Sequence, residues 1–299
     1  MPGLRARFYF MKVGFVNIFG LPNAGKSTLL NALVGEKLAI VSPKVQTTRH
    51  RIKAILNDAD SQIILSDTPG IIEPAYKLQE RMMQQVRSSL EDADLALLVA
   101  DIHADIQESD RVFTALKLKV PALVVLNKSD KRTDSKIKQE CIDFFTSRPY
   151  CKEVVVISAL KKQGLSGLMK KVKDRLPEGE PFFDTEDISD MPTRFFTAEI
   201  IREKIFQLYE QEIPYHSTVL IREFLEKPGL IRIMADVVVQ RESQKAIILG
   251  EKGSMIKKLG TLARKDIEEF LGSKVYLELF VKVRPNWRAN DIFLKEYGY

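Results

Sequence analysis

The stretch Gly20-Leu-Pro-Asn-Ala-Gly25-Lys26-Ser27 matches the phosphate-loop pattern G-x-x-x-x-G-K-[ST]. A β-rich apolar run precedes it at Val13–Phe19, and a helix-period run follows it at Ser27–Val34. In this strand–loop–helix setting, backbone N–H groups and the positive helix end bind an anion. Lys26 is expected to reach the β- and γ-phosphates, and the Ser27 hydroxyl to bind Mg²⁺. The alternative, a ligand-free glycine-rich turn, is disfavoured by that setting.

The first 176 residues around this loop alternate between strand and helix patterns. The β-rich runs are Val13–Phe19, Arg51–Leu56, Gln62–Ser66, Leu95–Ala100, Ala122–Leu126 and Val154–Ile157. The helix-period runs are Ser27–Val34, Leu78–Leu90, Ser109–Lys119, Ser135–Phe145 and Gly164–Arg175. This βαβ order predicts an α/β domain with a mostly parallel sheet and helices on both faces. Ligands of such sheets bind beyond the carboxyl ends of the strands.

Two further motifs each follow a predicted strand and indicate which nucleotide is bound. Asp67-Thr-Pro-Gly70 follows the third strand, so Asp67 is expected to hold Mg²⁺ through water, and the Gly70 N–H to approach the γ-phosphate. Asn127-Lys-Ser-Asp130 has the N-K-x-D form, and a carboxylate at Asp130 can accept two hydrogen bonds from guanine that adenine cannot donate. Either aspartate alone could merely cap a helix.

Ser158-Ala159 comes after the last predicted strand of this domain, where the Ala159 N–H is expected to reach guanine O6. Asn127 is expected to join its loop to the phosphate loop, and Lys128 to lie across the base. Because these motifs appear in this order, each after a strand, the sequence predicts that the ligand is GTP or GDP with Mg²⁺. An ATP-dependent kinase or RNA motor is disfavoured by Asn127–Asp130.

A second domain is predicted after a segment rich in proline and acids at residues 177–192, which is interpreted as a linker partly packed through Phe182 and Phe183. The elements expected beyond it are, in order, a helix at Thr197–Tyr209, strands near Ser217–Phe224 and Leu230–Val239, helices near Ser243–Leu249 and Ser254–Leu271, and a strand at Lys274–Val283. The predicted domains are therefore residues 1–176 and a smaller α+β domain at residues 193–299.

Gly250-Glu-Lys-Gly253 lies between two predicted helices and has the G-x-x-G form of an RNA-binding KH loop, although such a tetrapeptide is also a common interhelical turn. The segment from Arg241 to Arg288 contains eleven basic and six acidic residues, and this excess of five positive charges accounts for most of the chain's net charge of +6. The α-β-β-α-α-β order matches a type II KH domain, so the loop, the lysines and nearby apolar residues predict binding of single-stranded RNA. Ile247, Ile248, Met255 and Ile256 fit either the RNA groove or the core.

Taken together, these residues resemble the translation-factor-related P-loop GTPases, and among them the Era family. The likeness also covers Pro43-Lys-Val-Gln-Thr-Thr-Arg-His-Arg51, which looks like the family's first switch and implies that Thr48, rather than Thr47, reaches Mg²⁺ and the γ-phosphate. Departures from the family pattern are Asn17 and Phe19, where small aliphatic residues are usual, and Ala24 and Leu160.

The predicted GTP-binding residues are Gly20, Pro22, Asn23, Ala24, Gly25, Lys26, Ser27, Thr28, Asp67, Thr68, Pro69, Gly70, Asn127, Lys128, Asp130, Ser158 and Ala159. The predicted metal ligands are Ser27, Thr48 and Asp67, and the predicted catalytic residues are Asn23, Lys26, Thr48 and Gly70. The predicted RNA-binding residues are Ile248, Gly250, Glu251, Lys252, Gly253, Lys257 and Lys258.

Ile71 stands where Ras-like enzymes place the glutamine that orients the attacking water. An isoleucine can do neither acid–base nor hydrogen-bonding work, so slow intrinsic GTP hydrolysis is predicted. The resemblance suggests a K⁺ ion held by Asn23 as a compensating charge; the alternative is that Asn23 only braces the loop.

The resemblance implies a GTPase that binds the 3′ end of 16S ribosomal RNA and acts in 16S rRNA processing and assembly of the 30S small subunit. The alternative is an RNA-binding assembly factor that uses GTP chiefly as a structural ligand. A monomer is expected, in the cytoplasm or peripherally on the inner membrane.

Composition agrees with a folded, two-domain protein. The chain has 299 residues, of which 45% are hydrophobic and 29% charged, which excludes disorder throughout. The longest apolar run, Leu95–Ala100, is far shorter than the roughly 18 residues that span a bilayer. Met1–Phe10 lacks the features of a secretory signal, and either Met1 or Met11 fits as the start. Two cysteines and three scattered histidines suggest neither a disulfide scaffold nor a zinc site.

Overall fold

The structure, a computed structural model, describes residues 11–131 and 134–299; the expectation about Met1–Phe10 lies outside the described residues. Contacts divide the chain into two compact units. The first comprises residues 11–39, Thr48–Ile72 and Gln84–Asp190, and the second comprises Ile40–Thr47, Glu73–Met83 and Met191–Tyr299.

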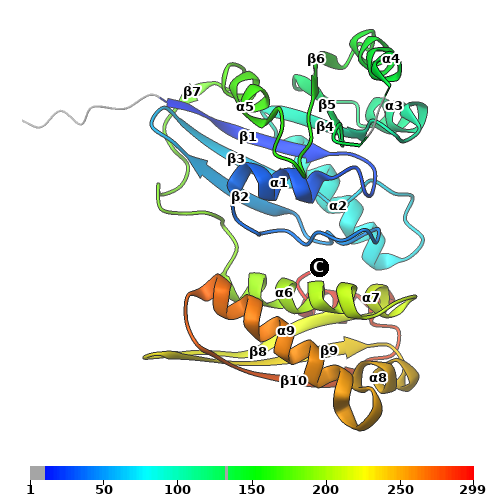
Figure 1. The fold of residues 1–299 in the computed structure, drawn as a ribbon, viewed down its shortest axis with the longest axis vertical. Helices are drawn as coiled ribbons and strands as arrows, with labels where there is room; N and C mark the ends of the chain where they lie inside the picture. Colours follow the sequence, from blue (N-terminus) through cyan, green and yellow to red (C-terminus); the bar gives the residue numbers. More distant parts are fainter. Residues whose placement is uncertain (1–10, 132–133) are drawn as a thin grey trace, which may run out of the picture. The chain divides into compact units, whose positions relative to one another are not determined.

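The first unit is built on a sheet with the strand order β2-β3-β1-β4-β5-β6, and β7 pairs with β1 beside that path (Figure 1). The strands are β1 (Met11–Phe19), β2 (Ile52–Asn57), β3 (Ser61–Asp67), β4 (Leu95–Asp101), β5 (Ala122–Asn127), β6 (Cys151–Val156) and β7 (Glu178–Gly179). β2 and β7 run antiparallel to their neighbours, and the other pairs are parallel. The expected mostly parallel sheet is confirmed.

Five helices flank this sheet: α1 (Lys26–Val34), α2 (Lys77–Glu91), α3 (Ile106–Ala115), α4 (Ser135–Thr146) and α5 (Leu165–Lys173). Helix α3 begins three residues earlier than predicted, because the Asp105 side chain accepts a hydrogen bond from the Gln107 N–H at 2.8 Å and caps the helix. The helix ends early because Lys117 has a positive φ of 49°.

The order of the strands brings the sequence motifs together. Strands β3, β1, β4, β5 and β6 are neighbours, and most of β4 and all of β5 are buried. β3, β4 and β5 end at Asp67, Asp101 and Asn127. β1 is followed by Gly20, and the chain after β6 reaches Ser158. Because these strands are parallel, the five chain segments meet at one edge of the sheet.

The predicted linker is more ordered than expected. β7 pairs with the start of β1, and the Gln62 side chain accepts from the Phe182 and Phe183 N–H groups at 2.7 and 3.0 Å. The Phe15 and Phe182 rings lie 5.0 Å apart. Residues up to Asp190 therefore pack as part of the first unit.

The second unit has a three-stranded sheet in the order β10-β9-β8, with β9 and β10 parallel and β8 antiparallel to β9. Its elements are α6 (Thr193–Leu208), α7 (Ile213–His216), β8 (Thr218–Lys227), β9 (Leu230–Val239), α8 (Glu242–Leu249), η1 (Glu251–Gly253), α9 (Ser254–Leu271), β10 (Val275–Val283), η2 (Trp287–Ala289) and α10 (Asp291–Glu296). Apolar residues of α6, α8 and α9 pack on the sheet and form one core. Figure 1 shows these three helices beside the sheet. The predicted α+β order is confirmed.

Three short elements were not predicted from sequence patterns: α7, which lies between α6 and β8, and η2 and α10, which form the C-terminal tail after β10. Trp287 is fully buried; its ring lies 5.7 Å from that of Tyr297, and its Nε1 donates to the His216 carbonyl at 3.0 Å. The tail therefore packs on its own domain. In the part of the chain that the structure describes, no helix combines the length and apolar character needed to cross a bilayer.

Candidate functional site: a nucleotide pocket and a glycine-loop surface

The phosphate loop curls between β1 and α1. Gly25 has φ 94°, and a Cβ at this position would lie 2.2 Å from the Asn127 side-chain nitrogen, so only glycine fits. Asn23 also has a positive φ, of 62°. The Lys26 ammonium donates to the Gly20 and Leu21 carbonyls at 3.1 and 2.9 Å, which folds its side chain over the loop. The loop thus has the geometry that the motif predicted.

Lys26 is almost completely buried. Loss of solvation lowers the pKa of its ammonium group to about 8, although the negative charge of Asp67 acts in the opposite direction. An anion bound in the loop would restore the stability of the charged ammonium.

Two hydroxyls converge on one buried carboxylate. Ser27 Oγ and Thr48 Oγ1 lie 2.9 Å apart, and both donate to Asp67 Oδ2, at 2.6 and 3.1 Å. The second carboxylate oxygen, Oδ1, is buried and has no hydrogen-bond partner. Burial raises the pKa of Asp67, with the nearby Lys26 charge opposing the shift.

This cluster fits Mg²⁺. A small set of oxygen donors with one carboxylate is the donor set that Mg²⁺ prefers beside phosphates, and an unpartnered buried carboxylate oxygen requires a cation or donor. The described residues contain no group of three histidine, cysteine, aspartate or glutamate side chains that could hold another metal ion. Of the two threonines considered, Thr48 is the one whose hydroxyl meets Ser27 and Asp67.

The segment after β3 approaches the phosphate loop closely. The Ile71 N–H donates to the Gly20 carbonyl at 3.1 Å, and a Cβ on Gly70 would lie 2.9 Å from the Pro22 nitrogen. The Thr68 hydroxyl donates to the Ile18 carbonyl at 2.6 Å, so it holds the segment to β1. Pro69 is buried beside it, and Thr28 follows Ser27 in the first turn of α1.

Asn127 connects three loops. Its side chain donates to the Ala24 carbonyl at 3.0 Å and accepts from the Ala159 N–H, also at 3.0 Å. The expected link between this loop and the phosphate loop is confirmed. The Ala159 N–H, which was expected to reach guanine O6, donates to Asn127 in this structure.

Asp130 and Lys128 are held by partners that the sequence motifs did not identify. The Ser158 hydroxyl donates to Asp130 at 2.5 Å, and this hydrogen bond is the main cause that lowers the pKa of the Asp130 carboxyl. The Lys128 ammonium donates to Asp101 at 2.7 Å. Asp101 directly follows the predicted strand Leu95–Ala100, so its position at a strand end was the available signal.

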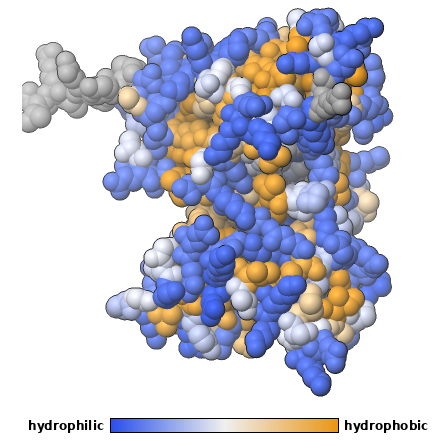
Figure 2. Space-filling view, viewed as in Figure 1, coloured by the Kyte–Doolittle hydropathy of each residue, from blue (hydrophilic) through white to orange (hydrophobic). Residues whose placement is uncertain are grey.

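The glycine loop of the second unit lies between α8 and α9. Gly250 has φ 69° and ψ 177°, and a Cβ there would lie 2.6 Å from Met255, so glycine is required. Glu251, Lys252, Lys257 and Lys258 are exposed around the loop. On the face drawn in Figure 2, hydrophilic residues predominate over this unit and apolar residues form small separate patches.

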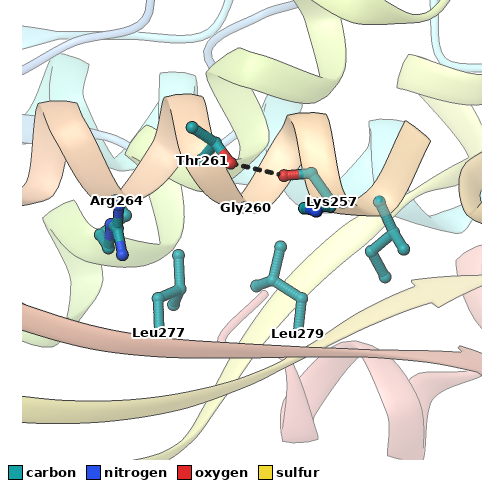
Figure 3. A pocket seen from close by; sticks show the side chains of 7 residues that line it. Lys257, Gly260, Thr261, Arg264, Leu277 and Leu279 are labelled. Carbon is teal, nitrogen blue, oxygen red and sulfur yellow. Dashed lines mark hydrogen bonds between the residues drawn. The ribbon is translucent and has the colours of Figure 1, made fainter. Parts of the chain in front are cut away.

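A groove beside this loop runs between α9 and β10 (Figure 3). It encloses about 320 Å³; α9 contributes Lys257, Gly260 and Arg264, and β10 contributes Leu277 and Leu279, whose side chains point toward the helix. The groove thus combines an apolar floor with basic side chains at its rim, which is suited to unpaired bases and their phosphates.

One predicted RNA-binding residue is corrected. Ile248 is fully buried in the core of the second unit, and its carbonyl accepts a hydrogen bond from the Tyr209 hydroxyl at 2.9 Å. Its side chain is not available to RNA. Ile247, the next residue toward the N-terminus, is 49% exposed, and Ile256 lines the groove. Helical spacing alone could not distinguish these faces.

Comparison with known proteins places both units in one family. Residues 15–128 match the family described as 50S ribosome-binding GTPase, and residues 212–288 match the KH domain family. GTPase Era of Trichlorobacter lovleyi is 43% identical over 289 residues, covering 96% of this chain and 98% of the relative. GTPase Era of Thermotoga petrophila is 42% identical over 298 residues, covering 96% and 97%. The chain belongs to the Era family.

Solved structures of the Era family have the same fold from end to end. A crystal structure of an Aquifex aeolicus Era variant bound to GDP·AlF4⁻ has a TM-score of 0.91 and 41% identity, covering 97% of this chain and 99% of that one. A structure of Era in complex with MgGDPNP and nucleotides 1506–1542 of 16S ribosomal RNA has the same TM-score, identity and coverage. The predicted P-loop GTPase domain followed by a KH domain is confirmed.

Proposed function

We propose that this protein is a GTP hydrolase that binds the 3′ end of 16S ribosomal RNA and acts in 16S rRNA processing and assembly of the 30S subunit. One observation carries the proposal: the near full-length likeness to an Era structure that holds both MgGDPNP and a 16S ribosomal RNA fragment. Residues 1–176 form the nucleotide-binding domain in this proposal and residues 193–299 the RNA-binding domain; the linker is residues 177–192, of which those up to Asp190 pack with the first unit.

Nucleotide binding is assigned to the edge of the first sheet. The phosphate loop binds the β-phosphate through its N–H groups, and Lys26 neutralises the β- and γ-phosphates. Asp130 accepts from guanine, and the Ala159 N–H is shared between Asn127 and guanine O6. Loss of two charge-assisted hydrogen bonds disfavours ATP by several kcal/mol, roughly 3–6 by the usual values.

Ser27, Thr48 and Asp67 are the proposed residues that hold Mg²⁺. When bound, Mg²⁺ offsets the charge that develops on the phosphate oxygens. The buried, unpartnered Asp67 Oδ1 and the two hydroxyls on Oδ2 support this assignment. Thr48 and the Gly70 N–H act at the γ-phosphate end, where they position the attacking water together with Lys26.

Hydrolysis is proposed to be slow, because Ile71 cannot orient water. A K⁺ ion beside Asn23 is proposed to supply the missing positive charge; the positive φ of Asn23 holds it at the bend of the loop. Faster hydrolysis in K⁺ than in Na⁺ buffer, with the difference lost in Asn23→Ala, is expected. Equal rates in the two buffers would contradict the role of K⁺.

A second candidate function is favoured by Ile71 itself: an RNA-binding assembly factor in which GTP is chiefly a structural ligand. Single-turnover hydrolysis with and without RNA distinguishes the two. A turnover rate that RNA raises supports the GTPase, whereas negligible hydrolysis under both conditions supports the structural role.

RNA binding is assigned to the glycine loop and the α9–β10 groove. The proposed RNA-binding residues are Gly250, Glu251, Lys252, Gly253, Lys257 and Lys258, with Ile256, Leu277 and Leu279 contacting bases. Crosslinking in cells followed by sequencing is the test. The expected product is the 3′ end of 16S ribosomal RNA; a different RNA, or none, would overturn the ribosomal role and leave GTP recognition intact.

A monomer in the cytoplasm, with peripheral association at the inner membrane, completes the proposal. This last part rests on the family resemblance alone. Flotation with vesicles of bacterial lipid, compared with vesicles of neutral lipid, tests it; protein that stays at the bottom of both gradients would contradict membrane association.

A further inference from the structure

A polar residue lies near the carboxyl end of β1, a central strand of the first unit. Asn17, in β1, is fully buried at a position where small aliphatic residues are usual in the family. Its side-chain nitrogen donates to the Ser89 carbonyl and to Asp92, the latter at 2.9 Å. Its side-chain oxygen accepts from Arg51 at 3.1 Å. Asn17 is therefore part of a polar network that joins β1 to α2 and the residues after it.

Arg51 is the centre of this network. Its guanidinium donates to both oxygens of Asp92, at 2.6 and 2.9 Å, and to the Ser66 hydroxyl at 2.9 and 3.1 Å. Its backbone N–H donates to the Gln85 side chain at 2.6 Å. The Arg51 side chain is only 12% exposed. A single planar side chain thus meets three elements at once, which an ammonium group could not do with the same geometry.

Arg51 lies directly before β2, where the network can position the segments that carry Thr48 and Asp67. The β2–β3 ladder ends at the pair Ile52 and Asp67, so regular backbone pairing no longer holds Arg51 or the chain that leads back to Thr48. Beyond the last backbone pair, the Arg51 guanidinium connects the two chain segments, because it donates to the hydroxyl of Ser66, the residue directly before Asp67. One side chain therefore holds both the chain that carries Thr48 and the chain that carries Asp67.

We propose that Arg51 is a positioning residue for the Thr48–Asp67 pair, and that Asn17 and Asp92 hold its guanidinium in place. The inference rests on the proposed function, since it concerns residues proposed to hold Mg²⁺. Partners that orient metal ligands from behind typically change metal affinity about 10- to 100-fold when removed. Loss of the guanidinium therefore weakens the contribution of Mg²⁺ to nucleotide binding without altering the phosphate loop.

The test measures release of a fluorescent, non-hydrolysable GTP analogue from the full-length protein in excess Mg²⁺ and in EDTA. In the wild type, EDTA is expected to speed release. Arg51→Met is expected to speed release about tenfold in Mg²⁺ and to leave the rate in EDTA nearly unchanged. Arg51→Lys keeps the charge beside Asp92 and is expected to restore part of the Mg²⁺ effect. Asn17→Ala is expected to fall between wild type and Arg51→Met.

Lys53→Met is the matched control, because Lys53 lies two residues further along the chain, in β2, and forms an ion pair with Asp190 at 3.0 Å. It is expected to leave the Mg²⁺ effect as in the wild type. If Arg51→Met speeds release equally in Mg²⁺ and in EDTA, or in neither, Arg51 has no positioning role. If EDTA does not change release from the wild type, the proposed Mg²⁺ site itself is wrong, and the inference fails with it.

Discussion

The nucleotide pocket and the glycine-loop surface both bind phosphates in our account, but they place their charges in opposite environments. Lys26 and Asp67 are buried beside each other, at 6% and 0% exposure, and the pKa values of both are shifted by lost solvation. Lys252, Lys257 and Lys258 are exposed to solvent around the glycine loop.

This difference predicts how each site responds to change. A buried charge is held by a few fixed neighbours, so removal of one group has a large effect and alters the stability of the empty protein. Exposed lysines contribute small, nearly additive terms that salt weakens. Single substitutions should therefore be severe in the pocket and mild on the surface.

The largest effect is expected from Asp130→Asn. Two charge-assisted hydrogen bonds to guanine are lost, which lowers GTP affinity about a hundredfold or more. Affinity for the xanthine nucleotide is expected to rise, because xanthine offers an acceptor where guanine has a donor. Calorimetry with GTP and the xanthine triphosphate measures both changes.

Asp134→Asn is the control for this substitution, because Asp134 caps α4 by accepting from the Lys136 N–H at 2.9 Å. It is expected to change stability little, because an asparagine oxygen caps a helix as well as a carboxylate does, and to leave nucleotide preference intact. A full GTP preference retained by Asp130→Asn would show that this carboxylate does not read the base.

Asp67→Asn is expected to have the next largest effect: it lowers nucleotide affinity but raises the stability of the empty protein. Loss of the carboxylate lowers nucleotide affinity about thirtyfold in Mg²⁺. The empty protein is expected to unfold at a higher temperature at neutral pH, because burial of the ionised carboxyl is relieved.

The dependence of folding stability on pH shows whether the Asp67 carboxyl stabilises or destabilises the folded protein. Burial raises the pKa of Asp67 above 3.8 in the folded protein, so the folded state keeps a proton that the unfolded chain has already lost. Wild-type stability is therefore lost, relative to Asp67→Asn, as the pH rises through the range above 3.8. Thermal unfolding across this range measures the difference; parallel curves would contradict a raised pKa.

Gly250→Ala examines the geometry of the surface site. The added Cβ would meet Met255, and φ 69° with ψ 177° is strained for alanine, so RNA affinity is expected to fall about tenfold. Gly272→Ala is a matched control, since Gly272 has φ 61° but no atom within 4 Å of its added Cβ. Fluorescence anisotropy with a 16S 3′-end oligonucleotide measures both; equal losses would mean that the loop geometry is not used.

The smallest effect is expected from Lys252→Ala, about threefold in RNA affinity at moderate salt. The slope of log affinity against log salt concentration is expected to fall by about 0.7 if one phosphate contact is lost. Lys274→Ala, between the C-terminal end of α9 and the start of β10, removes the same charge and is expected to leave the slope nearly unchanged. An effect as large as that of Asp67→Asn, whose carboxylate is buried, would contradict the contrast between the two sites.

Local patterns were sufficient to predict the order of elements and the positions of the nucleotide motifs, because strand ends in a parallel sheet meet at one edge. They could not predict that Ile248 is buried while Ile247 is exposed, since both fit a helix that is apolar on more than one face. The short helices η2 and α10 around Trp287 were missed, because they are stabilised by packing on distant residues rather than by their own periodicity. Asn17 was recognised only as a departure; its partners Arg51 and Asp92 are far away in the sequence.

Selection of guanine over adenine by Asp130 is tested most directly by isothermal titration calorimetry of the wild-type protein with GTP and with ATP in the presence of Mg²⁺. We expect GTP to bind at least about a hundredfold more tightly than ATP, because Asp130 accepts hydrogen bonds that only guanine donates. Equal affinities for the two nucleotides would contradict the account.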